Sequence, residues 1–196
     1  MVKYTASGYS LTVKGIQAIE KILKENSINT ILEFGSGKST DHFSELGYQI
    51  YSFDDDKEYS SKNKGVTVVD LVQLTDDQFE DIVTNKKIFV DNSNNYKVTH
   101  KRSSRQKNCF YKLNKDSFST KFSFIILDGP NGNGRSIAFN VMKDIINFPC
   151  YVFIDDYFHY PFIDTLLKIF PDSTEIETVK EGDIKGFAIY RVNSNE

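Results

Sequence analysis

The feature that most constrains the fold of this 196-residue chain is a regular alternation of helical and strand-like patterns. Residues 15–26 carry apolar side chains three and four positions apart, as one face of a helix requires, and the short apolar run 30–34 follows. The run 122–127 is almost wholly apolar, which is typical of a strand buried on both faces of a parallel sheet. Similar patterns predict helices at 39–47, 137–146 and 162–170, and strands at 48–53, 65–74 and 151–154.

The C-terminal part contains two strand patterns, at 174–179 and 186–192, joined by KEGDIK, which is typical of a hairpin. Strands that alternate with helices indicate a doubly wound α/β sheet, and a terminal hairpin adds antiparallel strands at its edge. The length fits one domain, and we find no internal repeat or interdomain linker. We therefore predict a Rossmann-like α/β fold, mostly parallel with a C-terminal antiparallel hairpin, as a single domain over residues 1–196.

One segment, residues 91–121, departs from this alternation. It is rich in Asn, basic in its middle at HKRSSRQK, and contains one strand-like piece, CFYKL. A loop of this length inside a compact domain is uncommon and is often functional. We expect a polar and basic insertion, which is either a solvated loop with one short strand or a cover over a ligand.

Charge and hydropathy argue against several classes of protein. The net charge is −3 and the pI is about 5.7, so no overall positive field attracts nucleic acid or anionic lipid. No run approaches the roughly 18 apolar residues needed to cross a bilayer, and the first residues lack the apolar core of a secretory signal. Two cysteines, Cys109 and Cys150, are too few for a disulfide framework, and we expect a reducing, cytoplasmic location.

The loop ILEFGSGKST, residues 31–40, admits two interpretations. Its Gly-Lys-Ser end matches a P-loop, in which Lys38 would bind phosphates, and Asp128 after FIIL would then help to hold magnesium. However, Leu32 stands where the first glycine of that motif belongs. A leucine within a strand cannot open the turn that wraps a phosphate, so this interpretation is the weaker one.

The second interpretation is a nucleoside site. Glu33 would repel a triphosphate, but it suits a ligand with an amino group and hydroxyls. Gly35 and Gly37 allow a sharp turn close to a ligand at the end of a strand. Asp54 lies nineteen positions after Gly35 (54 minus 35), near the ~20-residue spacing at which an acid accepts bonds from ribose hydroxyls. Thr40 replaces the third glycine of G-x-G-x-x-G, which disfavours a dinucleotide such as NAD.

Four motifs follow one another along the chain: LEFGSGKST, YSFDDDKEY, FIILDGPNGNGR and VFIDDY. In this order they resemble the class I S-adenosylmethionine-dependent methyltransferases, most closely small O-methyltransferase-like members with an E-x-G-S-G-x-S-T loop and a D-G-P turn followed by G-R. The resemblance covers roughly residues 10–192, apart from the insertion. It implies an enzyme that binds S-adenosylmethionine and methylates a hydroxyl.

Carried onto this chain, the resemblance implies a set of cofactor-binding residues. Asp54 would hold the ribose, with Asp55 or Asp56 in its place if the strand ends one or two residues later. A cluster of carboxylates beside the reactive sulfonium would suit its positive charge. The residues around the methionine moiety and the sulfonium would be Glu33, Gly35, Ser36, Gly37, Ser39, Thr40, Asp128 and Gly129.

Methyl transfer to a hydroxyl also needs a group that removes the acceptor's proton. The candidates follow the middle strands and are Asp128, Asp155, Asp156 and His159. Adjacent strand residues point to opposite sides, so only one of Asp155 and Asp156 should face the cofactor. The three aspartates could instead hold a divalent cation, but the related metal-dependent enzymes carry Asn where Asp156 stands, so we do not favour a metal.

Two further residues are candidates for binding the acceptor. Arg135 lies where a helix is expected to begin, an arrangement that favours an anionic group such as a uronate or a phosphate; the alternative is a solvated arginine. Tyr111 lies near the basic stretch of the insertion and could contact a sugar. Neither DPPY nor NPPY, which mark many base and amine methyltransferases, occurs. We therefore expect a small-molecule or saccharide hydroxyl as acceptor, and neither nucleic acid nor a membrane as partner.

The sequence leaves two other functions open. The fold could keep a nucleoside pocket without catalysing transfer and serve as a binding module. Alternatively, the Gly-Lys-Ser end of the first loop could belong to a phosphotransferase or another nucleotide enzyme.

Overall fold

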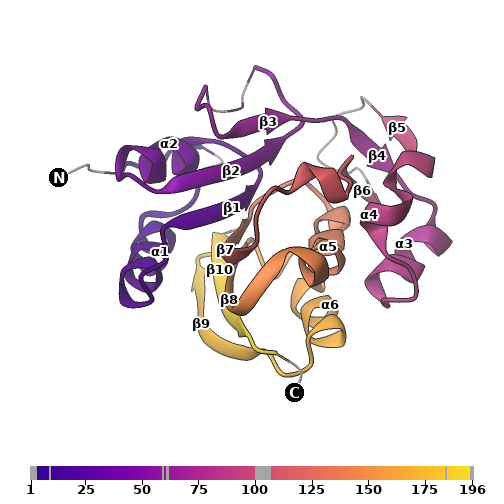
Figure 1. Ribbon diagram of the computed structural model, residues 1–196. Helices are drawn as coiled ribbons and strands as arrows, with labels where there is room; N and C mark the ends of the chain where they lie inside the picture. Colours follow the sequence, from indigo (N-terminus) through magenta and orange to yellow (C-terminus); the bar gives the residue numbers. More distant parts are fainter. Residues whose placement is uncertain are drawn as a thin grey trace.

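A seven-stranded sheet forms the centre of the molecule (Figure 1). The computed structural model describes residues 4–8, 10–58, 60, 62–99, 107–183 and 185–194. The strand order is β3-β2-β1-β7-β8-β10-β9, and β10 is antiparallel to both of its neighbours, whereas the other pairs are parallel. The strands are β1 (Thr30–Phe34), β2 (Gln49–Asp54), β3 (Val66–Val68), β7 (Phe122–Leu127), β8 (Ile146–Asp155), β9 (Thr174–Glu181) and β10 (Lys185–Val192).

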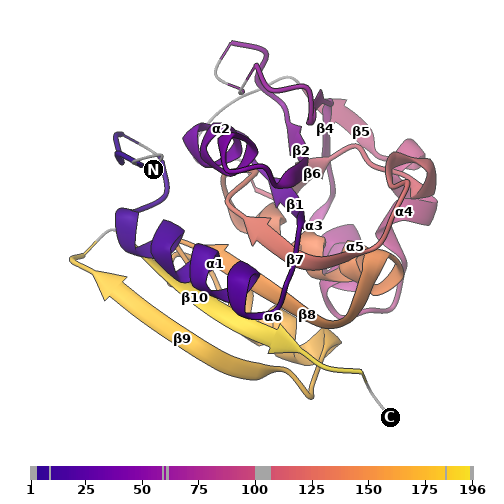
Figure 2. The ribbon, with the colours of Figure 1, turned by 60° about the vertical axis from the view of Figure 1, so that its left-hand side comes forward.

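Helices cover both faces of this sheet, as the alternation of patterns predicts. Ile31 and Phe124 point to the face covered by α1 and α2, whereas their neighbours Leu32 and Ile125 point to the face covered by α3 to α6. Figure 2 shows α1 along one face and the β9–β10 hairpin at the sheet edge. None of the helices in the described ranges is long and apolar enough to cross a membrane. The helices are α1 (Val13–Glu25), α2 (Lys38–Glu45), α3 (Asp76–Val83), α4 (Phe89–Asn92), α5 (Ile137–Ile145) and α6 (Phe162–Ile169).

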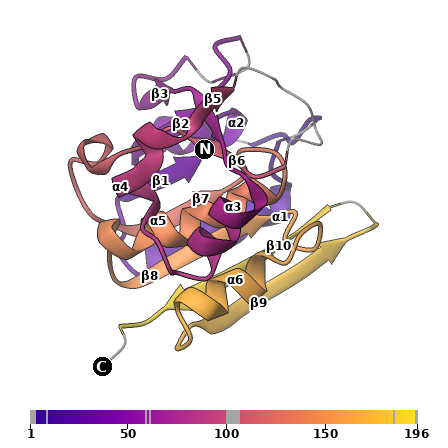
Figure 3. The same ribbon diagram turned by 90° about the vertical axis from the view of Figure 1, so that its right-hand side faces the viewer.

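The segment 65–74 is not the single strand that its pattern predicts. It forms β3 of the main sheet and then, after a break at Val69 and Asp70, β4 (Leu71–Gln73) of a second sheet. That smaller sheet has the order β5-β4-β6 and lies with α3 and α4 on the right-hand side of Figure 1, the side that faces the viewer in Figure 3. An alternating pattern of apolar and polar residues predicts that a strand forms, but it does not predict which strand it pairs with. Here the chain passes to the second sheet at the point where the β2–β3 pairing ends.

The 91–121 insertion is more structured than a solvated loop. It supplies β5 (Lys97–Thr99) and β6 (Cys109–Tyr111), and it contains the 3-10 turns η1 (Ser93–Asn95) and η2 (Lys115–Ser117). The strand expected in CFYKL is confirmed as β6, and all three of its residues are buried. Most of the basic stretch HKRSSRQK, residues 100–106, lies outside the described residues.

The helix expected at 39–47 begins one residue earlier, at Lys38. Gly37 is the N-cap of α2, and the Ser39 hydroxyl in the first turn donates to Glu33. The predicted end is confirmed: Leu46 is the C-cap, and Gly47 follows in the left-handed region with φ +90°.

A buried amide of α5 holds the connection between α3 and α4, which precedes the insertion. Asn140 of α5 is completely buried, and its Oδ1 accepts from the Phe89 backbone N–H at 2.8 Å. Its amide group donates to the backbone carbonyls of Ile82 and Lys87 at 3.1 and 2.9 Å. One side chain thus supplies hydrogen-bond partners for three backbone groups, at the two ends of the connection between α3 and α4. Polarity alone did not single out Asn140, since it lies in an otherwise apolar helix.

We expect Asn140→Ala to lower the free energy of unfolding by about 2–4 kcal/mol, because it leaves backbone groups buried without partners. Urea unfolding followed by circular dichroism measures the change. The matched control is Asn94→Ala, at an exposed position in the same region, which should change stability by less than about 0.5 kcal/mol. Equal stability of the two variants would contradict this role of Asn140.

Candidate functional site at the switch point

The order of the strands reverses between β1 and β7, and the loops that leave these two strands touch there. Backbone N–H groups of Asp128 and Gly129 both donate to the Phe34 carbonyl, at 2.9 and 2.6 Å. Gly35 has φ +93°, and a Cβ on it would lie 2.8 Å from the Gly129 nitrogen. Only glycine fits this approach, as the G-x-G pattern predicts for Gly35. In open α/β sheets the carboxyl edge at such a switch point is where ligands bind.

Glu33, in β1 just before the glycine turn, is hydrogen-bonded to residues that follow the turn. Its carboxylate is buried and accepts from the Ser39 hydroxyl at 2.6 Å and from the Thr40 hydroxyl at 2.5 Å. Burial raises the pKa of Glu33 to about 7, although the two hydroxyl bonds favour the ionised form. The Thr40 hydroxyl also accepts from the Gly37 N–H at 2.9 Å. These side chains therefore fix the shape of the turn from within.

Asp54 ends β2 beside the same turn. Its Oδ2 accepts from the Ser36 N–H at 2.7 Å and from the Ser36 hydroxyl at 3.2 Å, and its Oδ1 accepts from the Asp56 N–H at 2.7 Å. Asp54 thus joins the glycine turn to the acidic turn after β2.

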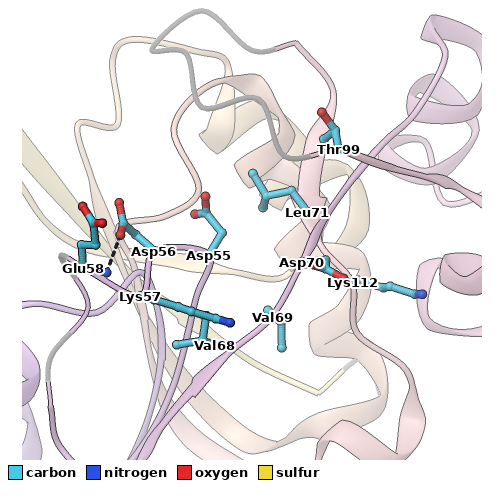
Figure 4. Close-up of a pocket in the computed structure, with 10 residues that line it drawn as sticks. All are labelled: Asp55, Asp56, Lys57, Glu58, Val68, Val69, Asp70, Leu71, Thr99 and Lys112. Atoms are coloured by element: carbon cyan, nitrogen blue, oxygen red, sulfur yellow. Dashed lines mark hydrogen bonds between the residues drawn. The ribbon is translucent and has the colours of Figure 1, made fainter.

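A cavity of about 720 Å³ adjoins the acidic turn after β2 (Figure 4). Its wall includes Asp55 and Asp56 after β2, Asp70 after β3, and Thr99 and Lys112 from the insertion. Sequence reasoning named the first two as substitutes for Asp54 and missed the other three. Asp70 follows the end of β3, a position typical of ligand-binding residues. The sequence pattern predicted one continuous strand over 65–74, so this position was not recognised.

Asp128 and Asp155 form a close pair of carboxyl groups at the ends of β7 and β8. The two groups lie close enough for each to shift the pKa of the other. Burial, followed by the charges of Asp128 and Asp156, raises the pKa of Asp155 to about 9. Burial also raises the pKa of Asp128, whereas the Arg135 charge opposes that shift. At neutral pH we therefore regard Asp155 as the protonated member and Asp128 as the ionised one.

Arg135 lies within this cluster and not at the surface. The residue is buried; its Nη1 donates to the Asp155 carbonyl at 2.8 Å and its Nε to the Pro130 carbonyl at 3.3 Å. Its guanidinium lies 5.5 Å from the centre of the Phe162 ring. The alternative of a solvated arginine is thus wrong. Arg135 tethers the loop after β7 to the end of β8, and its predicted contact with an anionic acceptor stays a prediction.

Asp156 and His159 lie farther out. The chain turns after Asp155, since Asp156 has φ +50°, and His159 is exposed. The His159 Nδ1 lies 3.8 Å from the Asp156 Oδ2. The structure therefore separates the two adjacent aspartates: Asp155 pairs with Asp128, and Asp156 lies beside the exposed histidine.

Among the described residues, no group of three or more His, Cys, Asp or Glu side chains is arranged to hold a metal ion. The Arg135 charge lowers the pKa of Asp128 in this pair, whereas burial raises it. The suggestion that Asp128, Asp155 and Asp156 hold a divalent cation stays a prediction for a chelation experiment.

Tyr111 is the predicted acceptor residue whose position differs most from expectation. The insertion was expected to cover an acceptor from outside, but Tyr111 is 1% exposed, and its ring stacks on Phe34 with centroids 6.2 Å apart. Its hydroxyl reaches the junction of the two glycine loops, where a Cβ on Gly129 would lie 2.3 Å from it. Tyr111 is thus beside the predicted cofactor residues.

Comparison with known proteins agrees with this geometry at the level of the fold. An O-methyltransferase-like protein from Klebsiella pneumoniae superposes with a TM-score of 0.54 at 12% identity, over 96% of this chain and 84% of that one. A 16S rRNA methyltransferase from T. thermophilus, in complex with AdoMet and guanosine, gives 0.52 at 11% identity, over 96% and 45% of the two chains. An O-methyltransferase from Bacillus cereus, in complex with SAH, gives 0.50 at 10% identity, over 95% and 84%.

These likenesses establish a Rossmann-like fold of the kind found in class I methyltransferases, which confirms the predicted fold class. At such low identities they do not extend to the residues of the site. No protein-family model matches the chain, and no curated protein matches it either.

The raised pKa of Asp155 predicts a pH-dependent stability. Because the folded chain keeps a proton that the unfolded chain releases above its ordinary pKa of 3.8, stability should fall as the pH rises from there to about 9. The slope is at most about 1.4 kcal/mol per pH unit for one proton. We expect Asp155→Asn to lose less stability between pH 5 and pH 8 than the wild type does.

Urea unfolding at both pH values measures this difference, and Asp172→Asn, at an exposed position, is the matched control. Parallel pH dependence in the wild type and Asp155→Asn would show that Asp155 does not carry the proton.

Proposed function

We propose that this protein is an S-adenosylmethionine-dependent methyltransferase that methylates a hydroxyl of a small molecule or saccharide. The observation that carries the proposal is the acid-lined carboxyl edge at the switch point, where a glycine turn meets buried carboxyl groups. A buried carboxylate cluster favours a cationic ligand, because Coulomb attraction is strong where water is excluded. A sulfonium nucleoside combines such a charge with ribose hydroxyls. The fold shared with methyltransferases supports the same choice.

The first loop is poorly suited to phosphates. Lys38, which would bind phosphates in a P-loop, is exposed as the first residue of α2. The Ser39 and Thr40 hydroxyls, which could contact magnesium in such an enzyme, donate to Glu33 instead. A buried acid with a partly ionised carboxyl below the turn would also repel phosphate. These contacts support a nucleoside site over a P-loop.

The residues present fit the proposed cofactor. The space beside Gly37, where a Cβ would meet nothing within 4 Å, leaves the backbone of the turn accessible to its methionine part, while Asp54 and the adjoining Asp55 provide acceptors for ribose hydroxyls. Asp70 lines the same cavity and could accept a hydrogen bond from the adenine amino group. When bound, S-adenosylmethionine supplies an electrophilic methyl group. The chain's own task is then to orient the acceptor hydroxyl and to remove its proton.

The acidic residues on the acceptor side have different roles in binding the cofactor and removing the proton. Asp128, the ionised member of the carboxyl pair, would attract the positive centre, and the proton on Asp155 prevents two adjacent buried charges. Asp155 in that form cannot accept a proton, so Asp128 or the His159–Asp156 pair is the candidate base. The half-buried Tyr157 and Tyr160 near this pair could stack against a sugar ring.

Binding calorimetry with S-adenosylhomocysteine, ATP and NAD tests the cofactor. We expect only S-adenosylhomocysteine to bind, and Asp54→Ala to weaken it by about 1.5–3 kcal/mol, as expected for a lost hydrogen bond to a charged group. Lys38→Ala is the matched control in the same loop and should have no effect, since the side chain is exposed. Circular dichroism checks that each variant is folded.

Tight ATP binding that is lost in Lys38→Ala would contradict the proposal and revive the P-loop interpretation. Loss of binding in Asp55→Ala but not in Asp54→Ala would move the ribose contact to Asp55, whose carboxyl lines the cavity.

A methyl-transfer assay tests the reaction, with sugars, uronates, catechols and guanosine as acceptors. We expect a sugar or other small hydroxyl compound to be methylated, and turnover to fall about 10²–10⁴-fold when the general base is replaced. Asp128→Asn and His159→Ala distinguish the two candidates, and added chelator tests for a metal. Guanosine as the preferred acceptor would indicate an RNA substrate, while binding without any transfer would indicate a non-catalytic module.

A further inference from the structure

Tyr111 is a buried tyrosine whose hydroxyl lies at the junction of the glycine loops. The side chain is 1% exposed, yet its hydroxyl makes no hydrogen bond with any residue that the structure describes; its contacts are ring contacts with Phe34 and Phe110. Buried hydroxyls are nearly always hydrogen-bonded, because leaving one unpaired is unfavourable. The Tyr111 hydroxyl is therefore available to a partner other than the protein, which is water or a bound ligand.

The position of Tyr111 is set by backbone contacts on several sides. The β6 strand pairs with β4, and the Lys112 N–H donates to the Asp70 carbonyl at 2.8 Å. On the other side, Gly134 packs so closely on the Cys109 backbone that a Cβ there would lie 1.9 Å from the Cys109 carbonyl oxygen. The ring cannot easily turn away, so its hydroxyl is held at the junction of the glycine loops.

The groups around this hydroxyl belong to the proposed cofactor site. The charges of Asp54, Asp55 and Asp128 all act on the phenol, and Arg135 acts on it with the opposite sign. The hydroxyl adjoins Gly129, which in turn contacts Gly35. It therefore lies near both Asp54, the proposed ribose residue, and Asp128, the proposed sulfonium residue.

We propose that Tyr111 is a cofactor-binding residue, and that its hydroxyl hydrogen-bonds a ribosyl oxygen of the bound nucleoside. This inference rests on the proposed function. A hydroxyl can both donate and accept, so it complements a ribose whose own hydroxyls donate to carboxylates. The insertion then forms one wall of the cofactor site, with Tyr111 at the junction and Thr99 and Lys112 along the adjoining cavity.

Tyr111→Phe tests the inference, since it removes only the hydroxyl. We expect it to weaken S-adenosylhomocysteine and adenosine by the same factor, about tenfold, because both carry the ribose. Without ligand, the variant should unfold at the same urea concentration as the wild type or at a higher one. Tyr96→Phe is the matched control: Tyr96 is also a mostly buried tyrosine of the insertion, but it stacks on Phe89 and lines a different cavity, so ligand affinity should not change.

The outcomes separate this inference from the function on which it rests. If wild-type protein binds S-adenosylhomocysteine and Tyr111→Phe binds it equally well or more tightly, the inference is wrong and the proposed function stands. A loss of unliganded stability without a loss of affinity would likewise assign the hydroxyl a structural role. If the wild type binds neither ligand, the proposed function itself fails, and the inference fails with it.

Discussion

The contact between the loops that follow β1 and β7 is the interaction on which the site depends. Two backbone N–H groups share the Phe34 carbonyl, and Gly35 approaches Gly129 so closely that neither could carry a Cβ without a shift. This contact brings the ends of two central strands together at the switch point, where the helices pass to opposite faces of the sheet. Every proposed ligand group is positioned relative to this junction.

Around the junction, the protein gathers acidic groups and then limits their repulsion in different ways. Glu33 is neutralised in part by a raised pKa and two hydroxyl donors, whereas Asp54 accepts backbone N–H groups. Asp155 keeps a proton next to Asp128, and Arg135 opposes the remaining charge. Such an arrangement lowers stability on its own and is relieved by a cation, which explains why we infer a positively charged ligand.

The insertion changes how this edge can be used. It pairs β5 and β6 with β4, and buried Asn140 of α5 holds the connection between α3 and α4 that precedes it. Tyr111 thereby reaches the glycine junction from the side opposite to Glu33, whose own contacts are with α2. A segment that looks like a polar loop in the sequence is therefore part of the wall around the proposed ligand.

The sequence by itself determined the elements whose signal is local. Apolar periodicity identified α1, α2, α5 and α6 but not α3 or α4, and it identified nearly all strands of the main sheet. The KEGDIK hairpin was readable from its turn, and the spacing of Gly35 and Asp54 pointed to the carboxyl edge. Only the tertiary structure decided which sheet β4 joins, that Asp155 pairs with Asp128, and that Tyr111 is buried at the junction. Periodicity records which face of an element is apolar, whereas these contacts depend on strand register and on groups far apart along the chain.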